Sequence, residues 1–164
     1  MFRSPTCTQT DKIAASALAL IAGIKIEEFA REMFSAGSNL KDKSPEEIFY
    51  QDYKKFIGEG NVSFGVGQIS SMDSEELKEI KEKLMPFMVS ECGRHDITRV
   101  YFMLTNILTE TTELLCIGQG AAQVVADAFH VGDANEELKQ TATLPGVVSR
   151  KKQLIPSFMT AMQQ

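Results

Sequence analysis

The sequence predicts an α/β protein with a mixed β-sheet of about five strands, covered by helices and preceded by two helices. Beyond residue 44, apolar runs of strand length alternate with segments that carry apolar residues at helical spacing. The first 36 residues carry apolar residues at helical spacing. With 164 residues, 43% of them apolar and 24% charged, the chain can bury a sizeable core.

Two helices are expected first, followed by a linker. Thr8 and Asp11 have the spacing of a capping box before the first helix, which we expect to run to about Gly23. A second helix with apolar residues four positions apart is expected to end at Gly37. The polar segment 37–43 shows no periodicity, and we interpret it as a linker.

Beyond the linker, helix and strand signals alternate. Ser44 and Pro45, with glutamate three residues after the cap, predict the start of a short helix. In the strand predicted over 61–69, glycines alternate with apolar residues and leave one face thin. Pro86 is expected to kink the long helix that Asp73 caps, or to end it early. The other expected elements are strands over 53–57, 100–104 and 114–117 and helices over 121–129 and from about 155.

Charge, hydropathy and cysteine usage exclude several classes of protein. The formal net charge of −5 disfavours nucleic acid, because the phosphate backbone attracts broadly basic surfaces. No run reaches the roughly 18 apolar residues of a membrane span, and the start lacks the layout of a signal peptide. Three widely spaced cysteines favour reduced thiols over a disulfide framework or a zinc site. We therefore expect a cytoplasmic protein with no membrane and no nucleic-acid partner.

The densest basic segment is a candidate for binding an anion. Between Ser149 and Gln153 the chain places Arg150, Lys151 and Lys152 side by side. A planar guanidinium beside compact ammonium groups can hold different oxygens of one phosphate-rich ligand. On composition alone, the same run is also typical of a solvated charged surface, and that alternative stays open.

A second basic segment consists of Lys54 and Lys55, next to Asp52 at the start of a predicted strand. Because successive side chains of a strand point to opposite faces, one of the two lysines at most can face a cleft. The alternative is an edge-strand lysine that discourages aggregation. Asp52 is a candidate to orient whichever lysine binds.

Other residues give weaker signals. His95 and His130 have no partners at metal-ligand spacing, so surface or packing roles are favoured over catalysis. The pair Gly118-x-Gly120 precedes a helix and is compatible with a phosphate seat at the helix start. A tight turn explains the two glycines with fewer assumptions.

Four segments carry a resemblance to a known family. They are residues 2–8 (Phe-Arg-Ser-Pro-Thr-Cys-Thr), 32–40, 52–56 with the pattern Asp-x-Lys-x-Phe, and 146–153 (Gly-Val-Val-Ser-Arg-Lys-Lys-Gln). Together they resemble the family II, manganese-dependent inorganic pyrophosphatases of the DHH phosphoesterase superfamily, in which Ser-Arg-Lys-Lys-Gln marks the carboxy-terminal domain. The resemblance covers essentially all 164 residues. It implies hydrolysis of pyrophosphate to two phosphates by a metal-activated water.

The resemblance also implies a division of the chain. Residues 1–36 correspond to the trailing helices of an amino-terminal metal-binding domain, residues 37–43 to the interdomain hinge, and residues 44–164 to the carboxy-terminal substrate-binding domain. The family's Asp-His-His motif does not occur in these residues. Manganese or cobalt, with magnesium, is therefore expected to bind in the full-length enzyme and none to this chain, which alone is expected to be inactive.

Carried over by position, Lys54, Arg150 and Lys151 are the expected substrate-binding residues, and no catalytic or metal-ligating residue is expected here. Lys152 is expected to face outward. Asn106 departs from the family, in which aspartate is common at this position.

Pyrophosphate is the expected partner, and we expect the full-length enzyme to be a homodimer. Residues 1–36 are expected to self-associate or to fold back on the second domain, because their apolar faces have lost a partner. The alternative function is a non-catalytic regulatory module that binds phosphate or polyphosphate through the same basic residues. A related phosphoesterase that acts on short oligonucleotides or cyclic dinucleotides is disfavoured, because its Gly-Gly-Gly-His type of element does not occur in these residues.

Overall fold

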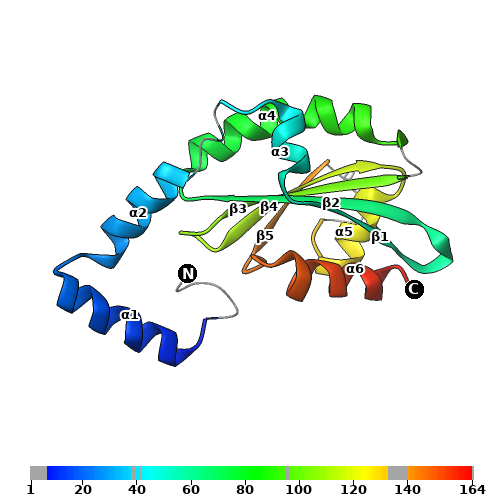
Figure 1. Ribbon diagram of the computed structural model, residues 1–164. Coiled ribbons are helices and arrows are strands. Elements are labelled where there is room, and N and C mark those ends of the chain that lie inside the picture. Colours follow the sequence, from blue (N-terminus) through cyan, green and yellow to red (C-terminus); the bar gives the residue numbers. More distant parts are fainter. Residues whose placement is uncertain (1–6, 38–39, 41, 95–96, 133–139, 164) are drawn as a thin grey trace.

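The computed structural model describes residues 7–37, 40, 42–94, 97–132 and 140–163 (Figure 1). Within them the predicted α/β fold is confirmed, with a mixed five-stranded sheet, covering helices and two preceding helices. The helices are α1 (Gln9–Ala22), α2 (Ile26–Gly37), α3 (Pro45–Gln51), α4 (Ser74–Glu91), α5 (Ala121–Phe129) and α6 (Ile155–Ala161), with a 3₁₀ turn at Glu59–Asn61 and a π turn at Arg150–Leu154. The strands are β1 (Tyr53–Ile57), β2 (Ser63–Ser71), β3 (Arg99–Asn106), β4 (Thr111–Gly118) and β5 (Thr141–Pro145).

The strands lie in the order β1-β2-β3-β4-β5. β2 and β3 are parallel, so the chain crosses over between them through α4, whereas the other neighbouring strands are antiparallel. Side-chain caps set the starts of three helices. Thr8 and Ser44 form capping boxes with Asp11 and Glu47, and Asp73 accepts N–H groups of the first turn of α4.

Two local features differ from the sequence-based expectations. No sequence pattern predicts β5, because it is only five residues long and mixes threonine with few apolar residues. Of the two effects expected of Pro86, a kink or an early end of the helix, the early end is wrong, since α4 continues to Glu91. Pro86 removes one N–H donor from the helix, but Pro86 and Glu82 are both exposed, so water can bond to the carbonyl that is left free.

Each face of the sheet packs against its own helices (Figure 1). α3 and α4 cover one face, the α3/α4 face, where Phe49 and Leu84 are buried. α5, the π turn and α6 cover the other, the α5/α6 face, where Tyr101 and Phe158 are buried. The two cores together enclose the three central strands.

Gly65 and Gly67 leave the middle of β2 without side chains on the α3/α4 face, as predicted for a strand with one thin face, and Ile69 is the buried apolar residue of β2 on that face. A Cβ at Gly65 would lie 1.9 Å from Tyr53 Oη, and a Cβ at Gly67 would lie 2.5 Å from the ring of Phe102. The rings of these two aromatic residues therefore occupy the space that side chains of β2 would need.

α1 and α2 extend away from the sheet (Figure 1). Leu20 and Ile21 are 85% and 82% exposed, and Ala19 is the buried residue of α1. The apolar side chains of α1 are thus not buried against the sheet. The linker predicted over 37–43 lies partly outside the described residues, and within it Leu40 is buried in the core of the α3/α4 face. None of the helices that the structure describes is long and apolar enough to cross a lipid bilayer.

Candidate functional site

Strand β1 places its two lysines on opposite faces of the sheet. Lys54 pairs with Val66, which is buried on the α5/α6 face, and Lys55 pairs with Gly65. Lys54 therefore lies on the face that the π turn covers, since the π turn buries Leu154 in the same core. Both lysines are exposed.

The segment that follows β5 is held in shape by its own polar side chains. Ser149 Oγ accepts a hydrogen bond from the N–H of Lys152 at 3.2 Å. Gln153 Oε1 accepts from the N–H groups of Val148 and Ser149 at 2.9 and 3.0 Å, and Gln153 Nε2 donates to the carbonyl of Gly146 at 2.7 Å. The first and last residues of the Ser-Arg-Lys-Lys-Gln run thus shape the turn, and the three basic residues between them are left for other contacts.

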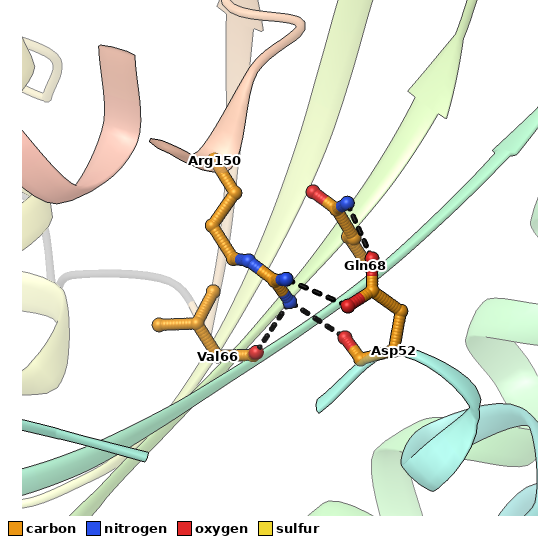
Figure 2. A network of polar contacts seen from close by, with 4 residues as sticks. All are labelled: Asp52, Val66, Gln68 and Arg150. Atoms are coloured by element: carbon orange, nitrogen blue, oxygen red, sulfur yellow. Dashed lines mark hydrogen bonds and ion pairs between the residues drawn. The ribbon is translucent and has the colours of Figure 1, made fainter. Parts of the chain in front are cut away.

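Arg150 is buried and ties the π turn to the start of β1 (Figure 2). Its Nη1 donates to the main-chain carbonyls of Asp52 and Val66 at 2.6 and 3.1 Å, and its Nη2 donates to Asp52 Oδ1 at 2.6 Å. These contacts use three of the five N–H donors of the guanidinium. Among the described residues, the Nε–H and the second Nη2–H have no acceptor.

Asp52, the residue at the end of α3, joins three elements. Its Oδ1 binds Arg150, and its Oδ2 accepts from Gln68 Nε2 at 2.6 Å. Partial burial alone would raise the pKa of Asp52, but hydrogen bonds from Arg150 and Gln68 and the charges of Arg150 and Lys54 outweigh it and lower the pKa. Asp52 is therefore ionised at neutral pH, and Lys54 lies close enough to act on it.

Of the three predicted substrate-binding residues, Arg150 bonds directly to Asp52, and Lys54 lies two residues after Asp52 on the α5/α6 face of β1. Lys151 follows Arg150 in the π turn and is exposed. Lys152 is exposed as well, so burial does not distinguish the two lysines. The three predicted residues belong to segments that meet on the α5/α6 face.

Two residues of this network have roles that the sequence did not indicate. Asp52 was a candidate to orient a lysine, and its carboxylate accepts hydrogen bonds from Arg150 and Gln68, two partners that were not predicted for it. Gln68 was not predicted at all. Its signal is a lone amide side chain in a strand made otherwise of apolar, glycine and serine residues.

The weaker candidates that the structure describes make no hydrogen bond or ion pair with Arg150, Asp52 or Gln68. His95 lies outside the described residues, and His130 is exposed at the end of α5. Gly118 and Gly120 have φ angles of 113° and 72°, and Arg99 Nε donates to the carbonyl between them, so a tight turn accounts for both glycines. In the part of the chain that the structure describes, no group of three or more His, Cys, Asp or Glu side chains is placed to hold a metal ion.

Asn106 is buried and completes the turn after β3. Its Oδ1 accepts from the N–H groups of Leu108 and Thr109 at 2.9 and 3.2 Å. Its Nδ2 donates to Ser74 Oγ at 2.8 Å. The side chain therefore stabilises the turn and the first residue of α4.

Replacing Asn106 by aspartate is expected to change the free energy of unfolding by no more than about 1 kcal/mol. Aspartate keeps both acceptor contacts, can accept from the Ser74 hydroxyl, and places negative charge at the start of α4. Asn106→Ala removes all three hydrogen bonds and is expected to cost about 2 kcal/mol. Urea denaturation compares the two variants, and an equal loss in both would contradict this assignment.

Comparison with known proteins groups these features in one family. The DHHA2 domain family matches residues 31–161. A cobalt-dependent inorganic pyrophosphatase of Clostridium perfringens is 41% identical over 157 residues, which cover 95% of this chain and 27% of that protein. A probable manganese-dependent inorganic pyrophosphatase of Clostridium acetobutylicum is 40% identical over 164 residues, which cover 99% of this chain and 51% of that protein. A crystal structure from Methanococcus jannaschii, assigned as a family II inorganic pyrophosphatase, matches with a TM-score of 0.78 and 34% identity and covers 99% of this chain and 51% of the solved one.

The fold and the network around Arg150 define a helix-covered α/β domain in which a buried arginine ties the π turn to the start of β1. The chain belongs to the DHHA2 domain family. The resemblance to family II inorganic pyrophosphatases is thereby confirmed. The chain spans about half the length of the Clostridium acetobutylicum relative and of the solved structure, and less of the Clostridium perfringens protein.

Proposed function

We propose that this chain is the substrate-binding domain of a family II inorganic pyrophosphatase, which hydrolyses pyrophosphate to two phosphates. The observation that carries the proposal is that Arg150, followed by Lys151 in the π turn, bonds to Asp52 directly before β1, on whose α5/α6 face Lys54 lies. The relatives support the choice of substrate, since proteins named inorganic pyrophosphatases match 95% and 99% of this chain.

The basic residues of this chain neutralise and position the substrate. Pyrophosphate is a compact anion, and its hydrolysis depends mainly on alignment and on stabilisation of charge. Water supplies the oxygen that bonds to one phosphorus, the bridging P–O bond breaks, and the departing phosphate keeps the electron pair. Lys54 and Lys151 offer exposed ammonium groups to the phosphoryl oxygens, and Arg150 offers its two unused N–H donors. None of the three is the nucleophile, so the chain alone does not hydrolyse pyrophosphate.

Manganese and cobalt appear in the names of the relatives. The described residues of this chain do not fit such an ion, because they bring no three metal-ligating side chains together. In this proposal manganese or cobalt, with magnesium, binds to other parts of the full-length protein. That protein is a cytoplasmic homodimer, and no contact of Lys54, Arg150 or Lys151 with a metal is required.

The proposal is tested by assaying the full gene product for release of phosphate from pyrophosphate in the presence of manganese, cobalt or magnesium. Metal-dependent release supports the pyrophosphatase. Binding of pyrophosphate without release would support the alternative instead, a non-catalytic regulatory module for phosphate or polyphosphate. A protein that neither binds nor hydrolyses pyrophosphate would refute both.

Replacing Lys54 by alanine is expected to weaken binding of pyrophosphate by the full gene product about tenfold, because one charge-assisted contact is lost. Lys55→Ala is the matched control, since it removes the same charge from the opposite face of the same strand. It is expected to change affinity less than about twofold. Calorimetric titration at low ionic strength measures both, and equal losses would contradict the assignment of Lys54.

A further inference from the structure

Asp52 accepts two hydrogen bonds from the guanidinium of Arg150, one at its main-chain oxygen and one at Oδ1 (Figure 2). We propose that Asp52 is a positioning residue, which holds Arg150 so that its free edge faces the bound anion. The inference rests on the proposed function, because it names what orients one of the binding residues.

Asp52 holds Arg150 at two points. Its main-chain oxygen accepts from Nη1 and its Oδ1 accepts from Nη2, both at 2.6 Å. A planar group held by both terminal nitrogens cannot turn about its long axis without breaking a bond. The third contact, from Nη1 to the carbonyl of Val66 at 3.1 Å, fixes its tilt against β2.

The edge of the guanidinium between Nε and Nη2 has no acceptor among the described residues. With both terminal nitrogens directed at Asp52, the second Nη2–H lies parallel to the Nε–H along this edge. Two parallel N–H groups match the spacing of two oxygens of one phosphoryl group. Asp52 thus converts a flexible side chain into a fork of fixed direction.

Gln68 in turn fixes Asp52. Its Nε2 donates to Asp52 Oδ2 at 2.6 Å, so one carboxylate oxygen is held from β2 and the other from the π turn. A carboxylate beside an anion site also repels the anion, which costs affinity. Asp52 therefore improves binding where the orientation that it gives Arg150 outweighs this repulsion.

The test is a double-mutant cycle on the full gene product, read out by calorimetric titration with pyrophosphate. Asp52→Ala and Arg150→Ala are each expected to weaken binding about tenfold. The double variant is expected to bind no more weakly than Arg150→Ala alone, because Asp52 acts through Arg150. Asp127→Ala removes an exposed carboxylate that bonds Gln123 on α5, and as the control for lost negative charge it should bind like the wild type. Unchanged or tighter binding by Asp52→Ala, or additive losses in the double variant, would overturn the inference.

Asp52→Asn decides the question if the alanine variant does not fold. The amide keeps an oxygen for Nη2 and leaves the main-chain contact in place, so its affinity is expected to fall about threefold, between wild type and Asp52→Ala. Thermal denaturation near the wild-type temperature would show that this loss is not unfolding. Wild-type or tighter affinity of the asparagine variant would overturn the role of Asp52 and leave the proposed function standing. Failure of the wild-type protein to bind pyrophosphate would overturn the proposed function together with it.

Discussion

Replacing Arg150 by lysine is expected to lower pyrophosphate turnover by the full gene product about tenfold or more. Lysine keeps the positive charge, but a compact ammonium group has no fork for a phosphoryl group. The same change is expected to lower the free energy of unfolding by about 2 kcal/mol. A single ammonium nitrogen cannot reach all three acceptors of the guanidinium, which are the main-chain oxygen and Oδ1 of Asp52 and the buried carbonyl of Val66. Steady-state kinetics and urea denaturation measure the two effects.

Arg94→Lys is the matched control for this variant. Arg94 forms an ion pair with Glu91, but its side chain is 63% exposed, and it follows α4, which covers the opposite face of the sheet from the π turn. Glu91 is buried, but Arg94 is mostly in solvent and lysine keeps the positive charge for Glu91, so turnover should stay at the wild-type level and stability within about 1 kcal/mol. If the two lysine variants lose turnover equally, Arg150 has no special part in binding.

Replacing Gly118 by alanine is expected to destabilise the fold by about 3 kcal/mol or more. Its φ of +113° is unfavourable for any residue with a side chain. A Cβ at this position would also lie 2.2 Å from the carbonyl oxygen of Thr98 and 3.1 Å from the Cα of Arg99. Both neighbours are backbone atoms, so the clash cannot be relieved by turning a side chain.

Gly60→Ala isolates the conformational part of this cost. Gly60 has a φ of +69°, but a Cβ there meets nothing within 4 Å. Its variant is expected to lose about 1 kcal/mol, the cost of left-handed backbone alone. Urea denaturation of the two variants gives the difference, and similar losses would mean that the turn at Gly118 adapts to a side chain.

The sequence predicted local structure well where one short pattern is sufficient to specify it. Thr8, Ser44 and Asp73 were predicted as helix caps and are observed as caps, because a cap depends on residues within one helical turn. The five residues of β5 have no such pattern. β5 is an edge strand that forms by pairing with β4, and a sequence pattern of five residues does not encode that pairing.

The candidate site was predictable in part for the same reason. The basic residues Lys54, Arg150 and Lys151 were visible as charged side chains in segments with a family resemblance. Alternation along β1 predicted that the two lysines separate, but not which of them shares a face with Arg150. That choice depends on the pairing of Lys54 with Val66 and on the helices that cover each face.

The sequence by itself determined the class of fold, the family resemblance and the residue types that can bind a phosphate-rich anion. These follow from composition, periodicity and short motifs, all of which act over a few residues. Only the tertiary structure decided that Arg150 meets Asp52 across 98 residues of chain, and that Gln68 holds the other oxygen of that carboxylate. Contacts of this kind depend on strand register and on how the π turn packs over the sheet, and both are set by burial of the whole core.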